Sequence, residues 1–243
     1  MTLARSSPPA GHDAAAMARL FDENAPTYDR VNSVLTAGRD GAWRRWAARQ
    51  ALGADARPDV LDACAGTGLL ALALARRGAA VTAVDVAPGA LALATARLAA
   101  EGLSAHTVIA DLADLAAVER IGGPFTAATL GFGLRYFASP DVPLRAVHAL
   151  LAPGGRLVLL ESVTPPHGLL GTPAALYFFD VAPRLGALLA RRTELYELLA
   201  ESTRTLGTAD RVAAHIERAG FDVVARRRFA AGVVAGFVAR RRP

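Results

Sequence analysis

Three aspartates stand at the ends of apolar runs in the first half of the sequence. Asp62 ends "VLD", Asp85 ends "AAVTAVD" and Asp111 ends "HTVIAD". The stretch "AGTG" follows the first of them, and its Gly66 and Gly68 permit a tight turn and a close approach of the backbone to a ligand. Such runs predict buried strands, and ligands bind beyond the carboxyl ends of parallel strands. The three carboxylates are therefore predicted to face one ligand site.

The positions of these aspartates restrict the class of ligand. The dinucleotide pattern G-x-G-x-x-G is broken, because Ala71 stands where its third glycine belongs. Asp62 would repel a pyrophosphate but attract a cationic amino acid group. Asp85 is placed to meet ribose hydroxyls, and Asp111 to accept a hydrogen bond from an adenine amino group. S-adenosylmethionine (SAM) meets these conditions and is the predicted cofactor; the alternative is that the aspartates only cap helices or turns.

Strands and helices alternate from residue 58 onward, which predicts a parallel sheet covered by helices on both faces. The last two strands are separated only by a short turn and must be antiparallel. The predicted fold class is α/β, a doubly wound, mainly parallel seven-stranded sheet that ends in an antiparallel hairpin. The predicted strands are 58–65, 79–86, 106–111, 125–134, 156–162, 221–229 and 231–241, and the predicted helices are 67–78, 87–102, 139–155 and 207–220.

The remaining segments flank or interrupt this alternation. Residues 1–12 are predicted to be a disordered tail, and residues 13–243 a single domain. Residues 13–52 are predicted to be helical, with Asp13 as the N-cap of the first helix and a second helix that starts near Asp40. Residues 163–207, rich in proline and aromatic side chains, are predicted to form an insertion that covers the ligand site.

Several longer motifs resemble a known family. The sequence contains "FDENAPTYDRVNSVLTAGRDGAWRRW", "LDACAGTG", "FGLR", "LAPGGRLVLLES" and "YELLAEST", followed by "AGF" and "GVVA" near the end. Together these resemble the UbiE/MenG methyltransferases of ubiquinone and menaquinone biosynthesis, over about residues 21–234. The first motif and "FGLR" are far more specific than "GTG", which many methyltransferases share.

The resemblance implies the class I methyltransferase fold, which is Rossmann-like, with SAM as methyl donor. It implies that Tyr28 lies in an N-terminal lid over the cofactor and that Arg135 faces the ring of the acceptor. It further implies a set of residues beside the cofactor, namely Thr67, Asp85, Asp111, Leu112 and Gly131.

The sequence departs from the family on the acceptor side. Tyr136 replaces the asparagine of "FGLRN", and the usual "YxxY" after the fifth strand becomes Tyr177 and Asp180. The predicted catalytic residues are Arg135, which would stabilise a phenolate, Asp180 as a base, and Tyr136 beside the ring. One alternative remains open for each of the two charged residues. For Arg135 it is a surface salt bridge, and for Asp180 it is an ion pair with Arg184, one helical turn away.

Three functions are compatible with these motifs. The first is C-methylation of an activated phenolic or quinol ring of a hydrophobic small molecule. The second is C- or O-methylation of a polyketide-like natural product, and the third is a cyclase that binds SAM without transferring the methyl group. The predicted partner is a hydrophobic aromatic small molecule, with a peripheral membrane contact and a homodimer as further possibilities.

Composition excludes other classes of function. All 27 basic residues are arginine and the net charge is +5, but the basic clusters contain no interleaved aromatic residues and no nucleic-acid motif. A nucleic-acid partner is therefore not expected. Cys64 is the only cysteine, which precludes an internal disulfide and suits a cytoplasmic protein, and no histidine–cysteine cluster indicates a metal.

Overall fold

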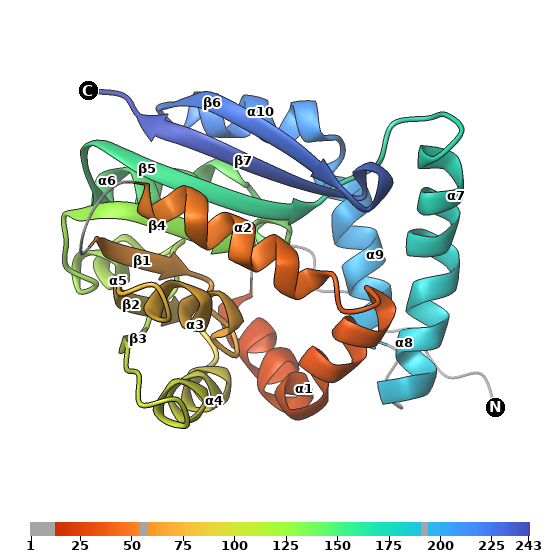
Figure 1. The fold of residues 1–243 in the computed structure, drawn as a ribbon, viewed down its shortest axis with the longest axis horizontal. Helices are drawn as coiled ribbons and strands as arrows, with labels where there is room; N and C mark the ends of the chain where they lie inside the picture. The colour runs from red at the N-terminus through yellow and green to blue at the C-terminus, as the bar shows by residue number, and fades with distance from the viewer. Residues whose placement is uncertain (1–12, 54–57, 191–193) are drawn as a thin grey trace.

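The computed structural model describes residues 13–53, 58–190 and 194–243. The predicted tail 1–12 lies outside the described residues. Ten α-helices and seven strands are seen in the described part of the chain (Figure 1). The strands are β1 Asp59–Ala63, β2 Ala80–Asp85, β3 His106–Ile109, β4 Phe125–Gly131, β5 Leu151–Ser162, β6 Phe221–Phe229 and β7 Val234–Arg241.

The helices are α1 Ala14–Leu35, α2 Asp40–Leu52, α3 Leu69–Ala75, α4 Pro88–Ala99, α5 Leu115–Glu119, α6 Asp141–Leu150, α7 Gly171–Leu176, α8 Ala182–Ala190, α9 Glu194–Leu206 and α10 Ala209–Arg218. A 3₁₀ turn, η1 Leu134–Tyr136, follows β4, and a π-helical turn, η2 Tyr177–Val181, joins α7 to α8. A second 3₁₀ turn, η3 Ala230–Gly232, precedes β7.

The seven strands form one sheet in the order β3-β2-β1-β4-β5-β7-β6. The first five strands in this order run parallel to one another, and β7 pairs antiparallel with both β5 and β6. The predicted doubly wound sheet and its antiparallel hairpin are therefore confirmed. The strand order reverses between β1 and β4, which is where open α/β sheets bind ligands.

Each face of the sheet carries its own apolar core. Alternate residues of a strand point to opposite faces, so Val60 packs with α2 and α3 while Leu61 packs with α5, α6 and α10. Trp43 and Trp46 of α2 are buried on the first of these faces. Burial of apolar area on both faces fixes the sheet, and with it the positions of the strand ends.

Both helices predicted at the amino end are present. The carboxylate of Asp13 accepts a hydrogen bond from the amide of Ala16 and caps α1, and α2 begins at Asp40. In Figure 1, α1, α8 and α9 gather beyond the ends of β1 and β4, and contacts join α8 to both α1 and α9. The insertion after β5 thus folds as helices α7 to α9 over the described residues of 163–207.

The largest difference from the predicted bounds lies where the helix before β5 ends and β5 begins. The helix expected over 139–155 ends at Leu150, and β5 begins at Leu151 instead of Arg156. Leu151 has an extended backbone, with φ −87° and ψ 148°, and Pro153 has no amide hydrogen with which to continue a helix. The register of β4 against β5 shifts here, so the additional strand residues precede an irregular pairing.

Candidate active site

A cavity of about 540 Å³ lies between the carboxyl ends of the strands, the N-terminal helices and the insertion. Its floor comes from β1, β2, β4 and the loops that follow them, and α1 and α2 form one wall. The opposite wall comes from α7, η2, α8 and α9. The predicted site residues that line it are Tyr28, Asp62, Gly66, Thr67, Asp85, Leu112, Gly131, Arg135 and Tyr136.

Asp62 is a buried carboxylate in the floor of this cavity. Its side chain is carried by β1, and the residue is 1% exposed. Thr129 on neighbouring β4 donates a hydrogen bond of 2.7 Å to Oδ1, but Oδ2 has no partner among the described residues. Burial raises the pKa of Asp62 to about 7, although the bond from Thr129 acts in the opposite direction. A cationic group bound in the cavity would satisfy the free oxygen.

Asp85 holds the turn that follows β1. Its carboxylate accepts from the amide of Gly66 at 2.8 Å and from the amide of Ala87 at 3.0 Å. Burial raises its pKa, and these amide donors limit the increase. The carboxylate therefore faces the cavity in a fixed orientation, as a polar group at the end of β2.

The two glycines of the turn have different roles. Gly68 has φ +76°, and a Cβ atom there would lie 2.5 Å from the Cβ atom of Ala94 in α4. Because glycine has no side chain, the turn can approach a neighbouring helix closely at this position. Gly66 has φ +53° with open space around it, and it lines the cavity while Gly68 does not.

The third predicted aspartate lies beside the cavity. The carboxylate of Asp111 accepts from the amide of Ala113 at 2.8 Å. Its neighbours Ala110 and Leu112 line the cavity, whereas Asp111 itself does not. A ligand would have to extend beyond the lining residues in order to reach Asp111.

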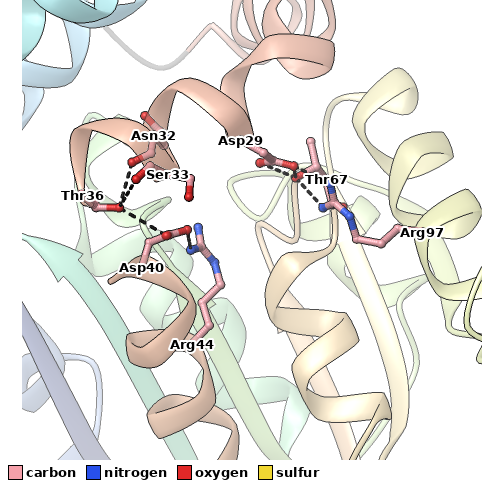
Figure 2. A network of polar contacts seen from close by, with 8 residues as sticks. All are labelled: Asp29, Asn32, Ser33, Thr36, Asp40, Arg44, Thr67 and Arg97. Atoms are coloured by element: carbon pink, nitrogen blue, oxygen red, sulfur yellow. Dashed lines mark hydrogen bonds and ion pairs between the residues drawn. The ribbon is translucent and has the colours of Figure 1, made fainter. Parts of the chain in front are cut away.

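Helix α1 is attached to the floor of the cavity by polar contacts (Figure 2). The hydroxyl of Thr67 donates to both carboxylate oxygens of Asp29, at 2.9 and 2.8 Å. Arg97 of α4 forms a 2.5 Å ion pair with the same carboxylate and donates to the carbonyl of Thr67. Nearer the beginning of α1, the carboxylate of Asp22 accepts a hydrogen bond from the amide of Ala90. These contacts hold α1 as a cover over the glycine turn.

A second polar cluster continues this cover into α2 (Figure 2). The hydroxyl of Thr36 donates to Asp40, and Arg44 donates to the other oxygen of Asp40 at 2.6 Å. The guanidinium of Arg44 lies over the ring of Phe132, 5.5 Å from its centroid. The cavity is thereby closed between α2 and the loop after β4.

Arg135 is a buried cation in the cavity wall. Its side chain is 1% exposed and forms an ion pair with Glu161, which is 0% exposed. Arg135 also donates to the hydroxyl of Tyr136 at 2.9 Å and lies over that ring, while its Nε has no partner among the described residues. Burial lowers the pKa of Arg135, but Tyr136 and Glu161 outweigh this effect and raise it. The predicted alternative of a surface salt bridge is therefore wrong, because the pair is buried.

Asp180 does not line the cavity. It lies on η2 with a partly exposed side chain, so the burial that motivated its prediction as a base is not found. Arg184 donates to the backbone carbonyl of Asp180 at 2.7 Å, not to its carboxylate. The structure therefore brings Arg135 and Tyr136 together at the cavity and places Asp180 outside its lining.

Two site residues were missed by the sequence analysis. Glu161 stands at the end of the buried strand "LVLLES", where an acid in an apolar run is a signal of a buried partner. Tyr196, in "YELLAEST", is 2% exposed and lines the cavity, and its hydroxyl has no partner among the described residues. Burial raises the pKa of this phenol, which keeps it protonated as a potential donor.

Comparison with known proteins now defines the family. The profile of the ubiE/COQ5 methyltransferase family matches residues 11–241. The chain belongs to this family. It is 40% identical to a demethylmenaquinone methyltransferase of Thermus thermophilus over 206 residues, 84% of this chain and 92% of that protein. It is 35% identical to the demethylmenaquinone methyltransferase of Mycobacterium tuberculosis over 223 residues, 92% and 91% of the two chains.

Solved structures are similar in fold. The [4+2]-cyclase SpnF matches with a TM-score of 0.69 and 18% identity, covering 98% of this chain and 99% of that one. The N-methyltransferase NodS of Bradyrhizobium japonicum, solved with S-adenosyl-L-homocysteine, matches with a TM-score of 0.57 and 16% identity, covering 84% and 87%. At these identities the likeness shows the fold alone, that of the class I methyltransferases.

The family membership and the fold make this chain a SAM-dependent methyltransferase. The unpaired oxygen of Asp62 fits this cofactor, because the amino acid part of SAM carries an ammonium group. Among the described residues there is no cluster of acidic, histidine and cysteine side chains that could hold a metal ion. No helix in the described ranges is long and apolar enough to cross a membrane.

Breaking the buried ion pair is expected to destabilise the protein strongly. Glu161→Gln leaves the Arg135 guanidinium buried without its carboxylate, which costs about 3–5 kcal/mol. Urea unfolding followed by tryptophan fluorescence measures this loss, since Trp43 and Trp46 are buried. The double variant Glu161→Leu with Arg135→Met serves as control, because it removes both charges and should recover most of the loss. Equal losses in the two variants would contradict a coupled pair.

Proposed function

We propose that this methyltransferase transfers a methyl group from SAM to a ring carbon of a demethylated quinol with an apolar side chain. The proposal is supported by its relatives, which are named demethylmenaquinone methyltransferases at 35–40% identity. The observation that carries it is the buried Arg135, whose Nε–H is unpartnered at the wall of a largely apolar cavity. A buried cation with a free donor is suited to an aromatic oxygen that becomes negatively charged.

The donor half of the site is proposed to bind SAM through the strand ends. Asp62 would bind the ammonium group, and Asp85 the ribose hydroxyls. Bound SAM supplies an electrophilic methyl group on its sulfonium sulfur. The cover formed by α1 excludes water from the reacting groups. The residues proposed to hold the cofactor are Tyr28, Asp62, Gly66, Thr67, Gly68, Asp85, Asp111, Leu112 and Gly131.

The acceptor half is proposed to activate the ring carbon. A quinol carbon becomes nucleophilic when the neighbouring hydroxyl is ionised, and Arg135 stabilises that oxyanion through Nε–H. Glu161 fixes the guanidinium from behind, since it accepts from both the Arg135 side chain and its backbone amide. Tyr136 is held by Arg135 and by Phe21, whose ring centroid lies 5.1 Å away. Its ring would then lie beside the acceptor.

The assay that tests this function supplies SAM with a deuterated methyl group and a reduced demethylnaphthoquinol. Mass spectrometry is expected to find the labelled methyl on the ring carbon. Arg135→Lys keeps a charge opposite Glu161 but loses the fork of guanidinium donors, so kcat should fall roughly a hundredfold at unchanged SAM affinity. If SAM binds and the quinol stays unlabelled, the proposed acceptor is wrong, and phenolic natural products become the acceptors to test.

Binding of SAM is expected to depend on pH through Asp62. Because the pKa of its carboxyl is about 7, the carboxylate that pairs with an ammonium group forms as the pH rises from 6 toward 7.5. Calorimetry should therefore show SAM affinity rising over this range. Asp62→Asn should weaken SAM binding by about 1.5–3 kcal/mol at pH 7.5 and flatten the dependence on pH.

The stability of the ligand-free protein should change in the opposite direction. A carboxyl whose pKa is raised in the folded state binds its proton more tightly there than in the unfolded chain. Its contribution to stability is present below pH 3.8 and is lost as the pH rises to about 7. Asp62→Asn should consequently melt at a higher temperature than the original chain at pH 7.5. A lower melting temperature would show that the carboxylate has a partner in the free protein.

Tyr196 is proposed to donate a hydrogen bond from its hydroxyl to an oxygen of the acceptor. Tyr196→Phe should raise KM for the quinol about tenfold, since one hydrogen bond contributes about 1 kcal/mol or slightly more. The free energy of unfolding should not fall, because the hydroxyl has no partner in the described residues. Tyr177→Phe is the comparison for stability: it removes a hydroxyl that donates to the carbonyl of Leu35 at 2.8 Å, so its free energy of unfolding should fall. An unchanged KM in Tyr196→Phe would remove this role.

A further inference from the structure

The helical segment after β5 has an apolar outer face. Thirteen large apolar side chains are exposed among the described residues, and eight of these lie between residues 169 and 189. Leu169 and Leu188 are 92% and 74% exposed. Tyr177 also lines the cavity, so we give the name leucine face to the other seven: Leu169, Leu170, Leu176, Val181, Leu185, Leu188 and Leu189.

The inner side of the same segment is also apolar. Ala174, Phe178 and Ala182 line the cavity, and Gly186 lies so close to the ring of Tyr196 that a Cβ atom would be 2.4 Å from it. A helix that is apolar on all sides is normally buried. Since one side already packs on the site, the exposed leucine face indicates a partner that covers it.

Size distinguishes between two candidates for this partner. A helical segment of about 20 residues is about 30 Å long and 10 Å wide, so its outer face presents on the order of 300 Å². A stable interface between two copies of a protein needs roughly 800 Å² from each copy. A lipid bilayer has no such requirement, because it can bind a single amphipathic face.

Charges of both signs surround the leucine face. Arg184 is exposed within the segment, and Arg204 lies beside it, 4.6 Å from the ring centroid of Phe179. Asp180, partly buried, is the only acid between residues 169 and 190. Exposed glutamates are carried by the neighbouring helix α9, at positions 194, 197 and 201. Long arginine side chains at an apolar face can extend to the phosphates of lipid headgroups.

We propose that the leucine face binds the surface of a lipid bilayer, with Arg184 and Arg204 at the level of the headgroups. The proposal rests on the proposed function for its purpose: an acceptor with a long apolar side chain is dissolved in lipid. The segment that contacts the bilayer is also the wall of the cavity, so the acceptor would cross one helix layer to reach Arg135. Membrane contact and the methyl acceptor site would thus share one structural element.

The test is sedimentation of the full chain with vesicles of phosphatidylcholine and phosphatidylglycerol. The original chain should sediment with the vesicles. Exchange of Leu170, Leu185 and Leu188 for glutamine should lower binding at least about tenfold, because three apolar side chains then no longer enter the lipid. The matched control exchanges three exposed apolar residues elsewhere, Leu93, Ile109 and Leu115, for glutamine, and it should bind like the original chain.

Three results would overturn the proposal. The first is an original chain that does not bind vesicles. The second is equal binding by the leucine-face and control variants. The third is a dimer in light scattering that only the leucine-face variant loses, which would assign the face to a second copy. Vesicle binding is measured without methyl transfer, so a chain that binds through this face but leaves the quinol unlabelled would refute the proposed function alone.

Discussion

The site depends on the burial of charge on two strands, β1 and β5, that lie on either side of β4. Asp62 on β1 is sealed from water with one oxygen unpaired, and Glu161 on β5 is sealed with its charge paired to Arg135. Isolated buried charges are costly, so each carboxylate requires a counterion in a fixed place. The protein provides the counterion of Glu161 itself, whereas no described residue pairs with Oδ2 of Asp62. One carboxylate is therefore paired within the fold, and the other lines the cavity with an oxygen that can accept from a ligand.

The cover of the site is held by a different kind of contact. Thr67 attaches α1 through hydrogen bonds to Asp29, and Arg97 through an ion pair with Asp29 in which both side chains are about one quarter exposed. Such contacts contribute less than buried apolar packing and are weakened by salt. The sheet beneath is fixed by apolar cores on both of its faces. The floor of the site is therefore fixed by apolar burial on both faces of the sheet, whereas partly exposed polar contacts join its cover to that floor.

Local sequence patterns predicted the sheet and the donor floor, because strand alternation and aspartates at strand ends depend on neighbouring residues. The acceptor wall was less predictable. Arg135 and Glu161 are far apart in sequence and meet only because β4 and β5 are parallel neighbours. The burial expected for Asp180 was also not found. Its apolar neighbours in the sequence suggested burial, but the orientation of η2 depends on how the insertion packs on α1 and α9. The helix predicted through residues 151–155 was wrong there, because Leu151 is extended and Pro153 cannot continue a helix, so the strand begins earlier.

The construction of the two halves explains where the sequence can change. Asp62 and Asp85, which are proposed to hold the donor, are carried by strands that each pair with a strand on both sides. Acceptor-side groups lie on η1, η2 and α9, which pack on one another and on α1 through side chains such as Phe21, Tyr136 and Tyr196. Side-chain packing accommodates exchanges of similar volume more readily than strand pairing does. The departures from the family pattern at Tyr136 and Asp180 lie on η1 and η2, where side-chain packing and not strand pairing holds the chain.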